Sequence, residues 1–138
     1  MTVSPERRRL NLYFRLLPDN ANAHAVDTVA FLAALRAALR GPLTILWDRS
    51  RIHRRSKVVR AYLARHPEIH AEDFPGYAPE LNPDEGVWGR TKYQRLPNYA
   101  PDSTHELRFR LGDELRDLRD QPGLLGSFIR HAGIPLRL

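Results

Sequence analysis

The stretch that decides the fold is Phe74-Pro75-Gly76-Tyr77-Ala78-Pro79-Glu80-Leu81-Asn82-Pro83-Asp84-Glu85-Gly86-Val87-Trp88. Pro75-Gly76 favours a turn, and the later prolines keep the residues before them extended. Asn82 is a good helix N-cap, and Pro83 suits the first helical position, where its missing N–H needs no partner. Glu85 then becomes the third helical residue. Trp88 and Lys92 follow on the same face of the predicted helix.

Glu85 has two interpretations. At the third helical position, a Glu commonly bonds back to the N-cap amide as the acid of a capping box. Alternatively, its carboxylate has a chemical role, since so many residues fix its position. The stretch alone favours the capping role, so a second feature of the chain is needed to decide.

That feature is an apolar run that opens at Gly41-Pro42 and ends at Asp48. The run predicts a buried strand, with Asp48 at its carboxyl end, where ligand chemistry collects in open sheets. A turn or helix-cap role for Asp48 is the alternative, for which Ser50 and Ser56 compete. Asp48 and Glu85 could converge on one divalent metal ion, because hard cations choose carboxylate oxygens and activate water in phosphodiester cleavage.

The segment Asp48-Arg49-Ser50-Arg51-Ile52-His53, taken with the Tyr77–Trp88 motif, resembles the DDE-type transposases of the IS630 and Tc1/mariner superfamily. In that family, an Asp at a strand end is followed by a His. Further along comes a motif close to Tyr-Ser-Pro-Asp-Leu-Asn-Pro-Ile-Glu-x-x-Trp. The resemblance covers nearly the whole chain from about Leu10. It implies that Asp48 and Glu85 are catalytic metal ligands for Mg²⁺ or Mn²⁺, and that His53 assists them.

The resemblance also implies a fold and a reaction. The fold is α/β and ribonuclease-H-like, with a mixed sheet flanked by helices and with C-terminal helices. In the complete enzyme, a metal-activated water cleaves a DNA strand at the element end, and the freed 3′ hydroxyl attacks target DNA.

The chain departs from the family in two ways. Arg49 stands where the family often has Asn. The family triad also needs a first Asp in an upstream hairpin, and nothing before Arg7 resembles that hairpin, while Asp19 and Asp27 come too late. We therefore expect the C-terminal portion of a transposase catalytic domain, which lacks the first hairpin and a third carboxylate.

The predicted elements alternate in α/β order. They are a strand within 10–17, a helix over 24–40, the strand ending at Asp48, a helix over 56–65, a strand over 69–74 and the helix of the motif. Without a first hairpin, the strand within 10–17 would be a sheet edge with no neighbour. A capping box at 103–106 opens a further helix, and a last short helix includes 124–129. We expect one domain over 1–138, with a core at 7–95 and a helical extension at 102–134.

The chain is basic, with 22 Lys and Arg against 16 Asp and Glu and a net charge of +6. The predicted DNA-contacting residues are Arg49, Arg51, Arg54, Arg55 and Lys92. Arginine pairs with phosphate through a planar fork, and neutralising phosphates releases counterions. The expected partner is double-stranded DNA, both transposon ends and target. A solvated loop in a chain with compositional arginine enrichment is the alternative.

Other classes are excluded by composition. No run of 18 apolar residues is present, so no membrane span is predicted. The first residues lack the apolar core of a signal peptide. There is no cysteine, which excludes disulfides and thiolate metal sites. A cytoplasmic protein is expected.

Three functions stay open. The first is the catalytic portion of an insertion-element transposase, completed by an upstream-encoded half or a second copy. The second is a non-catalytic DNA-binding or interaction remnant of a transposase. The third is a simple metal-dependent nuclease whose missing ligand comes from a partner chain.

Overall fold

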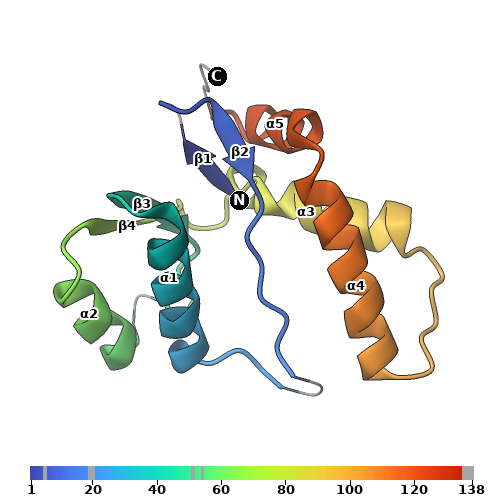
Figure 1. Cartoon of the computed structure of the whole chain (residues 1–138), viewed down its shortest axis with the longest axis horizontal. Helices are drawn as coiled ribbons and strands as arrows, with labels where there is room; N and C mark the ends of the chain where they lie inside the picture. The colour runs from blue at the N-terminus through green and yellow to red at the C-terminus, as the bar shows by residue number, and fades with distance from the viewer. Residues whose placement is uncertain (5, 19–20, 51, 54, 135–138) are drawn as a thin grey trace. The chain divides into compact units, whose positions relative to one another are not determined.

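The computed structural model describes residues 1–4, 6–18, 21–50, 52–53 and 55–134. These residues form five α-helices and two small sheets, a mixed α/β architecture consistent with part of an α/β nuclease-like domain (Figure 1). The chain divides into two compact units, one formed by residues 1–20 and 79–138 and the other by residues 21–78. Each unit has its own sheet and its own apolar core. The predicted single domain, with its core and helical extension, stays a prediction.

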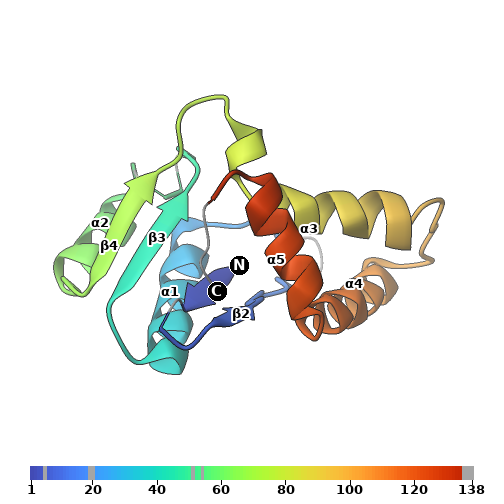
Figure 2. The same cartoon turned by 90° about the horizontal axis from the view of Figure 1, so that it is seen from above.

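The unit of residues 21–78 contains α1 (Ala25–Leu39), β3 (Leu43–Trp47), α2 (Lys57–Ala64) and β4 (Ile69–Asp73). These bounds lie within two residues of those predicted. The two strands pair in parallel, with Leu43 opposite Ile69 and Trp47 opposite Asp73. Both helices cover the same face of this sheet (Figure 2), and Leu32, Tyr62 and Ile69 form the buried core there.

In the described part of the chain, helices cover one face of β3 and the side chains of the other face are exposed, which corrects the prediction of a buried strand. Leu43, Ile45 and Trp47 pack against the core, whereas Thr44 and Leu46 are exposed. Successive side chains of a strand point to opposite faces, so a continuous apolar run does not require cover on both sides. The alternation places Trp47 on the helix-covered face.

The unit of residues 1–20 and 79–138 begins with a hairpin that sequence reasoning did not predict. Strand β1 (Thr2–Ser4) pairs in antiparallel register with β2 (Arg9–Asn11), so β2 has a neighbour and a hairpin does begin before Arg7. Neither strand contains an acid, and Glu6 lies in the turn.

The strand predicted within 10–17 is also shorter than expected, because it ends at Asn11. The Asn11 Oδ1 atom accepts the Leu12 N–H at 2.8 Å, which takes that donor out of the ladder. Leu12 is buried, and Phe14 and Leu16 pack around the same core. Beyond Asn11 the segment therefore contributes side chains to the core in place of strand pairing.

The remaining elements of this unit are η1 (Pro79–Leu81), α3 (Asp84–Arg90), the π-helical turn η2 (Thr91–Arg95), α4 (Thr104–Arg119) and α5 (Pro122–His131). Their common core consists of Leu12, Val87, Leu115, Leu118 and Leu125. The N-terminal segment, α3 and the C-terminal helices α4 and α5 thus share one apolar core.

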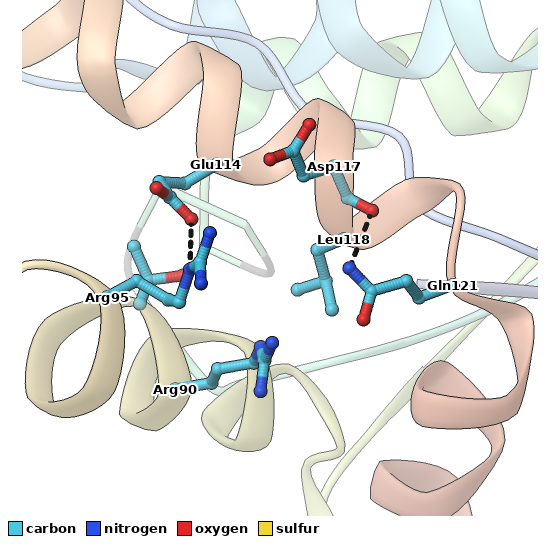
Figure 3. Close-up of a pocket in the computed structure, with 7 residues that line it drawn as sticks. Arg90, Arg95, Glu114, Asp117, Leu118 and Gln121 are labelled. Atoms are coloured by element: carbon cyan, nitrogen blue, oxygen red, sulfur yellow. Dashed lines mark hydrogen bonds and ion pairs between the residues drawn. The ribbon is translucent and has the colours of Figure 1, made fainter.

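A buried ion pair joins η2 to α4. The Glu114 side chain is only 3% exposed, and its carboxylate lies 2.6 Å from Arg95 Nε and 2.9 Å from Arg110 Nη2. Figure 3 shows Arg95 reaching towards Glu114 beside a cavity of about 10 Å³. A buried carboxylate needs such partners. The hydrogen bond that Arg95 donates to Glu114 raises the pKa of the Arg95 guanidinium, so Arg95 stays charged.

The start of α4 follows the predicted capping box, except that the Glu106 carboxylate bonds to the N–H of Asp102 and not to that of the N-cap residue Ser103. Ser103 Oγ accepts the Glu106 N–H at 3.1 Å, as expected for an N-cap. The Glu106 carboxylate accepts the Asp102 N–H at 2.8 Å and the Tyr99 hydroxyl at 2.6 Å. The Tyr99 bond is the main cause that lowers the pKa of Glu106, and the same bond raises the pKa of Tyr99.

Tyr99→Phe should therefore reduce the free energy of unfolding near neutral pH and leave it nearly unchanged at both extremes. The depressed pKa of Glu106 gives stability that is lost as pH falls through that pKa. The raised pKa of Tyr99 gives stability that is lost as pH rises through it. Urea unfolding of both proteins across a pH series measures the difference. A difference that is the same at every pH would contradict this account.

Candidate active site

Asp48 lies directly after β3, with a carboxylate that is two-thirds exposed. Its Oδ1 atom accepts the Ser50 N–H at 3.0 Å and lies 2.7 Å from His53 Nδ1. The turn role considered for Asp48 is thus present, but it uses one oxygen. Within the described part of the chain, Oδ2 has no hydrogen-bond partner, so it is open to a cation.

The His53 ring, which contacts Asp48, also stacks on the side chain of Trp47. The imidazole of His53 and the indole of Trp47 are parallel to within 5°, with centroids 5.1 Å apart. The Trp47 Nε1–H donates to Asp73 Oδ1 at 3.1 Å. Sequence reasoning missed Trp47 and Asp73 as site residues, because their proximity arises from the register of β3 and β4 and leaves no local pattern.

Four arginines in the loop after Asp48 are predicted to contact DNA, and the structure describes two of them, Arg49 and Arg55. The Arg49 guanidinium lies against the backbone of Gly76, whose missing Cβ would stand 3.4 Å from Arg49 Nη1. Arg49 and Arg55 are both exposed, and neither pairs with a carboxylate of the described residues. Arg51 and Arg54 lie outside the described residues.

Glu85 lies in the first turn of α3, in the other unit, with an exposed side chain. It lines a cleft of about 300 Å³ whose walls also include Glu80, Asn82, Phe128 and His131. Lys92 is exposed on η2, which continues α3. His131, at the end of α5, was not predicted at this site, because it is far away in sequence and only packing brings α5 against α3.

The structure does not show the capping-box role for Glu85. The helix begins one residue later than predicted, so Pro83, and not Asn82, takes the N-cap position. Asn82 Oδ1 still accepts the N–H of the first helical residue, Asp84, at 3.1 Å. The Asn82 N–H donates to the Pro79 carbonyl at 2.9 Å, so the amide that a capping-box Glu would satisfy already has a partner. Among the described residues, the Glu85 carboxylate has no hydrogen-bond partner.

Gly86 fixes how α3 meets α5. A Cβ built on Gly86 would lie 2.7 Å from both Cγ and Cδ1 of Phe128, which is closer than carbon atoms can approach. Only glycine permits the Phe128 ring to lie against the first turn of α3. The position of Glu85 therefore depends on the absence of a side chain at the next residue.

Gly86→Ala should destabilise the protein by roughly 1–3 kcal/mol through overpacking. Gly89→Ala in the same helix is the matched control, because nothing lies within 4 Å of its Cβ position, and it should stabilise by roughly 0.5–1 kcal/mol. Urea unfolding measures both. The cost of Gly86→Ala should shrink in a Phe128→Ala background, and an equal cost there would contradict the assigned contact.

The acidic residues fit a divalent cation in chemistry, since open carboxylate oxygens are the ligands that hard cations prefer. Asp48 supplies one such oxygen, and Glu85 supplies a whole carboxylate. Within neither unit do three Asp, Glu or His residues of the described segments cluster closely enough to hold a metal ion. That Asp48 and Glu85 share one ion stays a prediction.

A family model described as DDE superfamily endonuclease matches residues 13–108. The chain belongs to this family. Comparison with curated proteins and with solved structures finds no match. DDE superfamily endonucleases act on DNA and typically use divalent metal ions.

All the site residues predicted from the sequence lie inside the matched range. Their individual roles, which the match does not test, stay predictions. No helix in the described part of the chain is long and apolar enough to cross a membrane.

Proposed function

We propose that this DDE superfamily endonuclease is the catalytic portion of an insertion-element transposase of the IS630 and Tc1/mariner type. The observation that carries the proposal is the state of Asp48: Ser50 and His53 hold its Oδ1, and its Oδ2 has no hydrogen-bond partner among the described residues. The long motif around Glu85 supports the subfamily. The parallel pair β3–β4, with two helices on one face of the sheet, supports a ribonuclease-H-like fold.

The two acids would hold Mg²⁺ or Mn²⁺, which when bound supplies a Lewis acid and activates water for phosphodiester cleavage. The Ser50 N–H and the His53 ring orient the Asp48 carboxylate. Glu85 presents its carboxylate from a helix start that is already capped. Arg49, Arg55 and Lys92, which are exposed, would neutralise DNA phosphates, and we assign Arg51 and Arg54 to the same role from the sequence alone.

The partners in this proposal are transposon ends and target DNA, in a cytoplasmic setting. The third carboxylate of the family triad would come from a second copy of the chain or from a separately encoded half. If a second copy supplies it, strand cleavage rises steeply with protein concentration.

Asp48→Asn and Glu85→Gln should each reduce Mn²⁺-dependent nicking of duplex DNA by more than about 100-fold, since even groups that only support metal ligands are worth 10–100-fold. Matched controls are Glu72→Gln, in the same unit as Asp48, and Glu80→Gln, in the same cleft as Glu85; both should keep activity. Nicking of supercoiled plasmid measures the effect. Robust nicking by Asp48→Asn would contradict the assignment of Asp48 as a catalytic metal ligand.

The alternative function is a non-catalytic DNA-binding module, which the net charge of +6 also fits. A module of this kind binds duplex DNA with the same affinity with or without Mn²⁺. Its affinity is also unchanged by Asp48→Asn and Glu85→Gln. Absence of nicking combined with such metal-independent binding would favour this alternative over the endonuclease.

Arg49→Ala and Arg55→Ala should each lower the slope of log Kd against log salt concentration by about 0.9, the value expected for one lost phosphate contact. Arg116→Ala is the control, because Arg116 Nη2 lies 2.5 Å from Asp113 Oδ1 and this arginine is already paired. Fluorescence anisotropy of labelled duplex across salt concentrations measures the slopes. Equal slopes for all four proteins, wild type included, would remove these two arginines from the DNA contact.

A further inference from the structure

Four side chains form a continuous chain of contacts from β4 to Asp48. Asp73 Oδ1 accepts the Trp47 indole N–H at 3.1 Å, the indole stacks on the His53 ring, and His53 Nδ1 lies 2.7 Å from Asp48 Oδ1. We infer that Trp47 and Asp73 are positioning residues, which hold the His53 ring so that its Nδ1–H points at the Asp48 carboxylate.

The first link in this chain is set by the sheet. Trp47 and Asp73 are opposite each other in the parallel register, and both side chains are partly covered. An indole rotates about two side-chain bonds, so a hydrogen bond from its single N–H fixes the plane of the ring. Asp73 thereby determines the surface that Trp47 offers to the loop after β3.

The second link is the stack. The interplanar angle of 5° means that the imidazole ring is nearly parallel to the indole ring. His53 belongs to a short turn, in which its N–H donates to the Ser50 carbonyl at 3.1 Å. With the backbone fixed by the turn and the ring plane fixed by Trp47, the ring edge that carries Nδ1 faces Asp48.

The third link fixes the proton. A carboxylate accepts hydrogen bonds and does not donate them when ionised, so the proton between Asp48 and His53 belongs on Nδ1. Neutral His53 is then the Nδ1–H tautomer, and Nε2 is left for solvent or substrate. Bonds from His53 and Ser50 to Oδ1 hold the Asp48 carboxylate in one rotamer and direct Oδ2 away from both donors.

This inference rests on the proposed function, since it explains how Asp48 is oriented towards a metal ion. Groups that hold a ligating carboxylate typically contribute 10–100-fold to metal affinity. Trp47 and Asp73 would act through His53, without touching the metal or DNA.

The first test needs no metal. In ¹⁵N-labelled protein, the ring nitrogen shifts of His53 should show the Nδ1–H tautomer, and His53→Gln should remove and so assign those signals. Asp73→Leu and Trp47→Leu should shift His53 towards a mixture of tautomers. Asp73→Asn keeps an oxygen acceptor for the indole N–H and should retain the Nδ1–H tautomer. Circular dichroism confirms that each variant is folded.

Glu72→Leu is the matched control. Glu72 is adjacent to Asp73 on β4, and its carboxylate lies 2.8 Å from His70 Nε2. This control should change the ring signals of His70 and leave those of His53 unchanged. An unchanged His53 tautomer in both Asp73→Leu and Trp47→Leu would overturn the inference.

The second test is Mn²⁺ affinity, measured from the electron paramagnetic resonance signal of free Mn²⁺. Asp73→Leu should weaken binding by about 10-fold, with Asp73→Asn and Glu72→Leu close to wild type. Equal weakening in Asp73→Asn and Asp73→Leu would contradict positioning through the indole hydrogen bond. If wild type binds no Mn²⁺, the proposed function fails, and the tautomer measurement still decides the inference.

Discussion

The parallel pairing of β3 with β4 is the constraint on which the Asp48 site depends. It sets Trp47 opposite Asp73, and the ladder continues one residue further, where the Phe74 N–H donates to the Trp47 carbonyl at 2.9 Å. A slip of one residue would move every side chain to the other face. Trp47 would then lose Asp73, and His53 would lose the ring against which it stacks.

Among the described residues, both candidate acids keep carboxylate oxygens without a hydrogen-bond partner, because other groups already satisfy the local backbone. At Asp48 a single carboxylate oxygen accepts the turn bonds, which leaves the other oxygen open. Near Glu85, the Asn82 N–H that a capping-box Glu would bond donates to the Pro79 carbonyl, and Asn82 Oδ1 accepts the N–H of Asp84, the first helical residue. An ordinary solvated acid needs no such arrangement, so the shared pattern is what favours ligand binding at both positions.

The elements that could be predicted are those with a local signal. The helix over 25–39 follows from an Ala- and Leu-rich segment that ends before Gly41, and the strand over 43–47 follows from the apolar run after Pro42. The start of α4 follows from its Ser103 cap. Motif spacing likewise singles out Asp48, His53 and Glu85 in the sequence, and the contact between Asp48 and His53 is present in the fold.

What could not be predicted depends on contacts between distant residues. The strands of the β1–β2 hairpin have only three residues each, too few for an alternating pattern to be recognised, so only their pairing reveals the hairpin. The stack of His53 on Trp47 and the contact of Phe128 with Gly86 likewise arise from tertiary packing. The strand predicted within 10–17 is longer than the observed one, which ends at Asn11, because apolar residues that pack on helices resemble strand residues in sequence.

The central proposal is that Asp48 and Glu85 ligate the same divalent ion. Paramagnetic broadening by substoichiometric Mn²⁺ in the amide spectrum of the whole chain tests it most directly. The account predicts that one bound ion broadens the signals of both Ser50 and Gly86, and that Asp48→Asn abolishes both effects together. Broadening confined to one of these residues, or broadening at Gly86 that survives Asp48→Asn, would contradict it.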